Sequence, residues 1–195
     1  MNFLAHVYLS GSEEPIQLGN FIADFVKGKA WEFYPAEVRK GISLHRQIDN
    51  YTDMHPLVRQ GRARLWERHR HYGGVILDIF YDHFLASTWS FYTQEPLRAY
   101  TERFYQVVRK HYELIPTPLR DVFPYIEKEN WLYHYQYKSG IEKALQGMAR
   151  RAKFPSNMGT AIPDLEKDYN IFKMEFHSFF DDLRNFSVRT LRDLH

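Results

Sequence analysis

Histidine and aspartate residues occur inside segments that otherwise have the composition of a hydrophobic core. His45 and Asp49 are four residues apart, which on a helix places their side chains about 5–6 Å apart on one face. Asp82 and His83 interrupt a run of large apolar residues in the same way. Burying a charge costs several kcal/mol unless the charge is paired or bound to a metal. These residues therefore indicate a site where chemistry is done.

A single His–Asp pair at this spacing is more often a core histidine bonded to a nearby carboxylate than a metal site. Two other segments offer groups of the same kind, because His6 lies in the N-terminal stretch and Asp24 lies in the apolar segment 19–25. Four segments can therefore converge on one centre. We expect them to do so.

The ligand types available limit the chemistry of such a centre. The chain has 195 residues and no cysteine, so a metal would have to be held by imidazole and carboxylate groups. Mixed shells of this kind suit Mn²⁺, Fe²⁺, Zn²⁺ or Mg²⁺, and composition does not choose among them. A metal held in this way lowers the pKa of a bound water and offsets the charge of a phosphoryl group. The residues thus predict hydrolysis of a phosphate ester.

The elements that must position these groups are helices. Apolar residues fall at helical spacing in almost every segment, which predicts an all-α fold, a bundle of about eight or more helices. Asp24 is expected inside a helix that begins after 12–15 and ends near Gly28, and His45 inside a helix over 35–51. A buried helix is expected over 75–85. The remaining predicted helices cover 57–72, 97–113, 119–127, 139–152 and 164–194.

Length and charge bound the kind of protein. We expect a single domain over 1–195, with the core motifs in 1–90 and a helical extension over 91–195. The net charge is only +2, which does not indicate a nucleic-acid partner. Neither a signal peptide nor an apolar run of about 20 residues is recognisable, which favours a cytoplasmic protein with no membrane partner.

One segment is strongly basic, with only Glu67 to oppose its positive charge. A solvated surface helix is the more frequent explanation of such a segment, and a nucleic-acid contact is another. A third is a docking face for an acidic partner. The arginines concerned are Arg59, Arg62, Arg64, Arg68 and Arg70.

Four ordered motifs resemble the acyl carrier protein phosphodiesterases. They are the NFLAH run at 2–6, GNFIADFVKG at 19–28, GISLHRQIDNYTD at 41–53 and LDIFYDHFLASTW at 77–89. Sparser similarity, such as Trp131, continues into the second half. The resemblance implies hydrolytic removal of 4'-phosphopantetheine from holo acyl carrier protein with a divalent cation such as Mn²⁺, with Mg²⁺ or Fe²⁺ as alternatives. It also implies an HD-like fold, because the family is regarded as a divergent relative of the HD-type metal phosphohydrolases.

Resemblance and burial together assign roles to the site residues. Asp49 and His83 are expected to orient ligands or to move protons, and Arg46 to grip phosphodiester oxygens or to form a surface ion pair. Acyl carrier proteins are acidic, which would suit the arginine-rich segment as their docking face. The residues assigned as metal ligands are His6, Asp24, His45 and Asp82, with Asp49 as the nearest alternative.

Two alternative functions share these features. One keeps the metal site but acts on a nucleotide or another small phosphodiester, as HD-type relatives do. The other is a non-catalytic helical module that binds an acidic protein.

Aromatic clusters such as 131–135 and 176–180 are interpreted as core, because each ring buries a large area.

Overall fold

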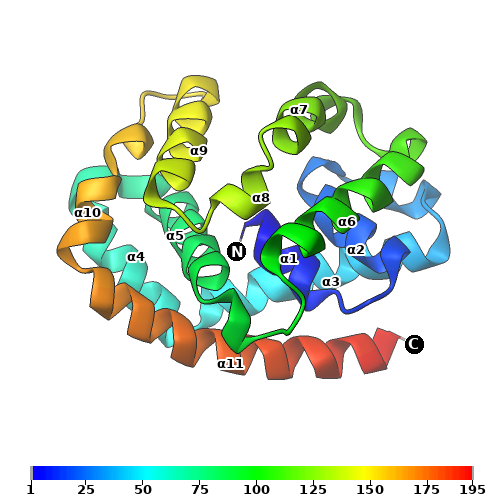
Figure 1. Cartoon of the computed structure of the whole chain (residues 1–195), viewed down its shortest axis with the longest axis horizontal. Helices are drawn as coiled ribbons and strands as arrows, with labels where there is room; N and C mark the ends of the chain where they lie inside the picture. Colours follow the sequence, from blue (N-terminus) through cyan, green and yellow to red (C-terminus); the bar gives the residue numbers. More distant parts are fainter. Residues whose placement is uncertain (1, 195) are drawn as a thin grey trace.

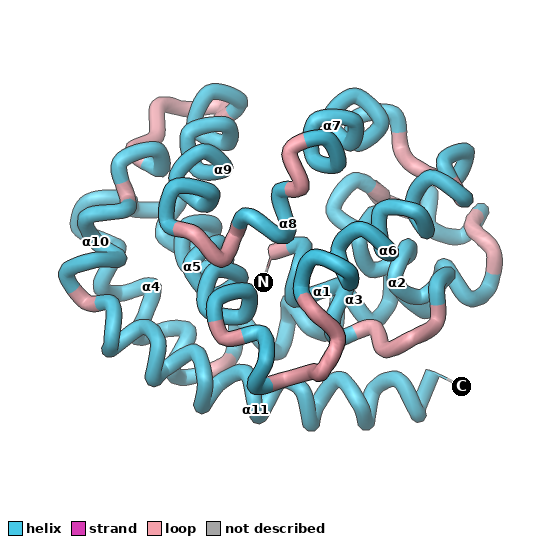
Figure 2. The backbone as a smooth tube through the Cα atoms, in the orientation of Figure 1, coloured by secondary structure: helices cyan, strands magenta, loops and turns pink. Residues whose placement is uncertain are grey.

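The computed structural model describes residues 2–194, and within that range all regular structure is helical (Figures 1 and 2). The all-α prediction is confirmed. None of the helices in this range is both long and apolar enough to cross a bilayer. The α-helices are α1 (Phe3–Leu9), α2 (Glu14–Ile22), α3 (Ala36–Met54), α4 (Pro56–His69), α5 (Gly73–Ser87), α6 (Leu97–Lys110), α7 (Thr117–Lys128), α8 (Trp131–His134), α9 (Lys138–Arg151), α10 (Ile162–Lys167) and α11 (Tyr169–Leu194).

The helices surround one hydrophobic core to which both halves of the chain contribute. Helix α5 is buried over most of its length, as its apolar composition predicts. Helix α11 runs along one side of the bundle and contacts α1, α3, α4 and α5 (Figure 1). The short helix α1 therefore lies between α5, α11 and α2, in the middle of the molecule.

Helices α2 and α3 pack backbone against backbone. A Cβ atom added at Gly19 would collide with the carbonyl oxygen of Val38, and one added at Gly41 would collide with that of Ile16. Only glycine permits this close approach. The approach matters for the site, because it brings the end of α2 against the middle of α3, where His45 lies.

Most predicted helices are present, and their ends differ for identifiable reasons. Helix α2 ends at Ile22 and a 3₁₀ turn, Ala23–Phe25, follows, so Asp24 lies just beyond the helix rather than inside it. Helix α3 runs on to Met54 and stops because His55, which precedes a proline, takes an extended conformation. The predicted helix over 164–194 is two helices, α10 and α11.

The spacing of apolar residues does not predict helices α1 and α8. They span 7 and 4 residues, too few for a helical period to show. Asn130 caps α8, because its side chain accepts a hydrogen bond from the backbone N–H of Tyr133 at 3.3 Å. Its φ of 39° lies in the left-handed region that asparagine tolerates. This cap fixes the position of Trp131.

Candidate metal centre and its cavity

Two histidines and an aspartate meet where α1 crosses α3. His6 Nε2 lies 3.1 Å from Asp49 Oδ1, and His45 Nε2 lies 3.1 Å from Asp49 Oδ2. The two imidazole rings stack with their centroids 3.9 Å apart. One ligand atom from each residue lies within 4.8 Å of the others. We call these three residues the His–His–Asp cluster.

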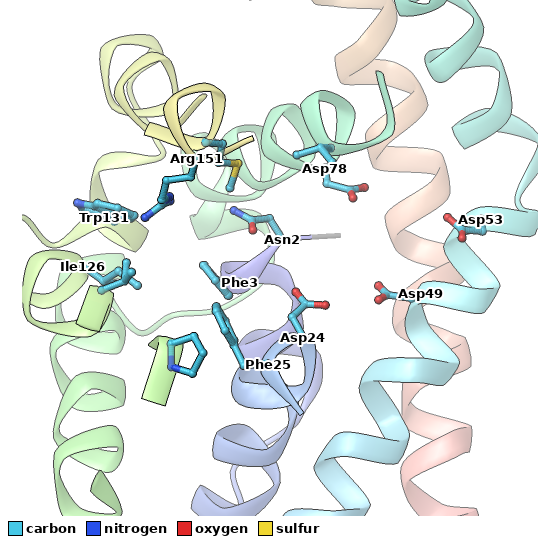
Figure 3. Close-up of a pocket in the computed structure, with 14 residues that line it drawn as sticks. Asn2, Phe3, Asp24, Phe25, Asp49, Asp53, Asp78, Ile126, Trp131 and Arg151 are labelled. Carbon is cyan, nitrogen blue, oxygen red and sulfur yellow. The ribbon is translucent and has the colours of Figure 1, made fainter. Parts of the chain in front are cut away.

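Asp24 adds a second carboxylate to the cluster. Its Oδ1 atom lies 3.1 Å from His45 Nε2, so this nitrogen faces both Asp24 and Asp49. Figure 3 shows the two carboxylates directed toward each other from opposite sides. Asp24 is more exposed than Asp49, and both line the same cavity. The structure thus brings together four of the residues that the sequence singled out.

The charges in the cluster are strongly coupled. Burial alone would lower the pKa of His45, but hydrogen bonds with Asp24 and Asp49 outweigh burial and raise this pKa to about 9. Burial and the neighbouring His45 lower the pKa of His6 to about 4. Burial would raise the pKa of both carboxyls, and the hydrogen bonds of His45 hold them below their usual range instead. A proton on His45 therefore holds two carboxylates together.

Asn20 of α2 contacts the imidazole of His45 and the backbone of His6. His45 Nδ1 lies 2.9 Å from the backbone carbonyl oxygen of Asn20 and 3.1 Å from its side-chain Oδ1. The Asn20 amide donates in turn to the carbonyl oxygen of His6, at 2.9 Å, and to Ser10 Oγ, at 2.8 Å. With Nδ1 as the donor, His45 presents Nε2 to the carboxylates. This completely buried asparagine was not singled out from the sequence.

The donor set fits a divalent cation. Neither ring nitrogen of His6 makes a hydrogen bond to any described residue, since Nε2 faces Asp49 without the required geometry. An unsatisfied buried polar group costs about 1–3 kcal/mol, and a cation at Nε2 would remove that cost. Two imidazoles with one or two carboxylates form a shell that suits Mn²⁺, Fe²⁺ or Zn²⁺. His6, His45, Asp49 and Asp24 are the residues that could hold it.

The cluster opens into a cavity of about 630 Å³ with two unlike walls (Figure 3). Arg151 is the one cationic side chain among the described residues that line it. The first wall is acidic and is formed by Asp24, Asp49, Asp53 and Asp78, beside Phe25 and Val75. The second wall is largely apolar and is formed by Pro118, Val122, Ile126, Trp131 and Met148, with Arg151.

Asp82 lies elsewhere and has a different partner. Its two carboxylate oxygens accept hydrogen bonds from the backbone N–H groups of Leu4, at 2.9 Å, and Ala5, at 3.2 Å. Burial raises the pKa of this carboxyl to about 7, although the two N–H groups oppose the rise. Asp82 therefore caps the N-terminus of α1 and is not a member of the cluster in this structure. The aspartate that joins the two histidines is Asp49.

His83 and Arg46 also lie outside the cavity lining. His83 Nδ1 lies 2.8 Å from the carbonyl oxygen of Tyr135, and Nε2 lies 3.0 Å from the hydroxyl of Tyr169. Both nitrogens are thus occupied by tyrosines of the second half of the chain. Arg46 is exposed and its guanidinium stacks over the Trp31 ring at 5.6 Å. The structure brings neither residue to the cluster.

Several cavity residues carried only a partial signal in the sequence. Asp78 shares a helix face with Asp82, as its spacing predicts, and burial raises its pKa. Asp53, in the last turn of α3, lines the cavity as well. Trp131 and Arg151 are far from the motifs in sequence, and Trp131 was interpreted as core. Only the packing of α8 and α9 against the site brings them there.

Fold and site together define a helical protein whose histidine–aspartate cluster opens into a substrate-sized cavity. A family model described as acyl carrier protein phosphodiesterase matches residues 1–183. The chain belongs to the acyl carrier protein phosphodiesterase family.

Individual relatives agree with this assignment. The chain is 36% identical over 187 residues to an acyl carrier protein phosphodiesterase of Serratia proteamaculans, covering 94% of this chain and 95% of that protein. It is 34% identical over 181 residues to the protein of that name from Photorhabdus laumondii, covering 92% and 91%. The corresponding identity to the Yersinia enterocolitica protein is 32%, covering 92% and 94%. No solved structure matches the chain.

Proposed function

We propose that this protein is a metal-dependent phosphodiesterase that removes 4'-phosphopantetheine from holo acyl carrier protein and leaves the apo form. The observation that carries the proposal is the His–His–Asp cluster at one wall of the cavity, in a chain of this family. The names of the relatives supply the substrate.

In this proposal His6, His45 and Asp49 hold the cation, and Asp24 completes the shell from the more exposed side. The bound cation would activate a water and neutralise charge on the phosphodiester. Asn20 keeps Nε2 of His45 directed at the ion through its contacts with Nδ1. Because the shell includes two imidazoles, it favours Mn²⁺ or Fe²⁺ over Mg²⁺, which prefers oxygen ligands.

The second wall suits the rest of the substrate. The cavity volume is within the range of ligand pockets, about 300–1,000 Å³. A phosphopantetheine arm has an anionic phosphate at one end and an uncharged chain beyond it. We place the phosphate between the cluster and Arg151, and the chain against Val122, Ile126 and Met148.

The other predicted site residues take supporting roles in this proposal. Asp82, predicted as a metal ligand, holds α1, and with it His6, in place. His83 joins α5 to Tyr135 and Tyr169. Arg46 packs its guanidinium over the Trp31 ring. A cytoplasmic location is proposed as well, supported by the lack of cysteine.

The test is to incubate holo acyl carrier protein with the enzyme and Mn²⁺ and to measure the intact mass of the carrier. We expect loss of the phosphopantetheine mass, no loss with a chelator, and recovery when Mn²⁺ is restored. An unchanged carrier mass at high enzyme concentration would overturn the proposal. Cleavage of nucleotides or small phosphodiesters without cleavage of the carrier would favour the HD-like alternative instead.

A further inference from the structure

The arginines of α4 are largely occupied by carboxylates of the same chain. Arg64 makes a bidentate pair with Glu175, at 2.7 and 2.6 Å, and Arg68 pairs with Asp164 at 2.8 Å. Arg62 pairs with Asp53. A partner that used these side chains would have to break internal ion pairs first. The positive charge expected on this helix is therefore mostly neutralised.

Helix α9 and the segment after it present cations of another kind. Lys143, Arg150, Arg151 and Lys153 are all exposed. Among residues 2–194, no carboxylate lies within 4.0 Å of their charged nitrogens, whereas Lys138 at the start of the helix is paired with Glu166. These four side chains are free to meet negative charge from outside. We call them the α9 cations.

Two of the α9 cations line a second hollow that adjoins the cavity. This hollow has a volume of about 450 Å³ and is lined by Lys143 and Arg150 together with His134 and Ser139. Glu129 is the one carboxylate in its lining. Trp131 lines both the hollow and the cavity, while Arg151 lines the cavity. The cationic surface is thus continuous with the mouth of the site.

We infer that the α9 cations are the docking surface for the acidic face of the carrier protein. The inference rests on the proposed function. Charge complementarity next to the site would steer an acidic protein so that its prosthetic group enters between Trp131 and Arg151. Docking on the α9 cations breaks no internal ion pair, whereas docking on α4 would break the ion pairs of Arg62, Arg64 and Arg68. Charged contacts of this kind act mainly on the association rate and on its dependence on salt concentration.

The test compares two charge-reversed variants. The α9 variant, K143E/R150E/K153E, changes three of the α9 cations, and the α4 variant, R59E/R70E, changes one arginine on α4 and the one that directly follows it. Arg151 is left unchanged because it lines the cavity. Substrates are holo acyl carrier protein and the small phosphodiester bis(p-nitrophenyl) phosphate, at low and high salt. We expect the α9 variant to lose about tenfold or more in kcat/KM for the carrier, mainly through KM, and to lose its salt dependence. The kcat/KM of the α4 variant for the carrier should stay within about twofold of the wild-type value.

The small substrate reports on folding and on the catalytic site in both variants. Normal carrier cleavage by the α9 variant, or a larger loss in the α4 variant, would overturn the docking inference alone. If the wild-type protein does not cleave holo carrier, the proposed function fails instead. Binding of carrier to metal-free enzyme, measured by fluorescence anisotropy, then still decides the docking inference. Weaker binding by the α9 variant than by wild type supports the inference, and equal or tighter binding rejects it.

Discussion

The two walls of the cavity are built in opposite ways. The acidic wall gathers groups whose spacing is local, such as His45 and Asp49 on one turn of α3, and ties them into one network. The apolar wall consists of side chains from three helices, α7, α8 and α9, with Arg151 among them. If the proposed function holds, reaction chemistry and substrate recognition are assigned to different walls. We therefore expect that each can be disrupted without the other.

The largest expected effect comes from the acidic wall. His45→Ala removes the side chain that faces both carboxylates. We therefore expect loss of the bound cation and a fall in activity of about 100-fold or more. Loss of a residue that only orients a metal ligand typically costs about 10–100-fold, and His45 is proposed as a ligand itself. Metal analysis after purification without chelator, with the carrier mass assay, checks this. Gln47→Ala, on the same helix, is the matched control and should keep its metal. Full metal content in His45→Ala would reject the ligand set.

Substitution of Asp82 tests whether its hydrogen bonds with α1 support the acidic wall. Asp82→Ala leaves two buried N–H groups of α1 without an acceptor, which should lower the free energy of unfolding by about 2–4 kcal/mol. Asp82→Asn retains one acceptor oxygen and should lose roughly half as much. Urea denaturation measures the loss, and metal analysis of the folded protein should give normal content. Loss of metal with unchanged stability would instead make Asp82 a ligand, as the sequence suggested.

The fold and the residues of the cluster could be predicted from the sequence, because both leave a pattern along the chain. Apolar periodicity predicts α3 and α5, and polar residues within apolar segments point to His6, Asp24 and His45. The role of Asp82 could not be predicted, since its partners are backbone N–H groups 78 and 77 residues away, which have no residue type of their own. The ion pairs of the α4 arginines could not be predicted for a similar reason. Glu175 lies 111 residues from Arg64.

Trp131 tests the role of the apolar wall. Trp131→Ala should keep its metal and lose about tenfold in kcat/KM for holo carrier, because a large contact area is removed while the cluster is untouched. Metal analysis and carrier kinetics check both parts. Trp66→Ala on α4, an equally large change at an exposed ring, is the control and should have little effect. If Trp131→Ala lost its metal, the two walls would not be separable.

The smallest effect concerns His83, which joins the two halves of the chain away from both walls. Burial lowers its pKa in the folded protein below the ordinary value of 6.5. The unfolded chain therefore binds the proton first as the pH falls, so this contribution to stability is complete above about pH 6.5 and is lost below it. The loss is at most about 1.4 kcal/mol per pH unit, until the folded pKa is reached. Urea denaturation between pH 7 and pH 5 should show a shallower pH dependence for His83→Gln than for wild type, because glutamine does not titrate. Equal slopes would mean that His83 is as readily protonated in the folded protein as in the unfolded chain.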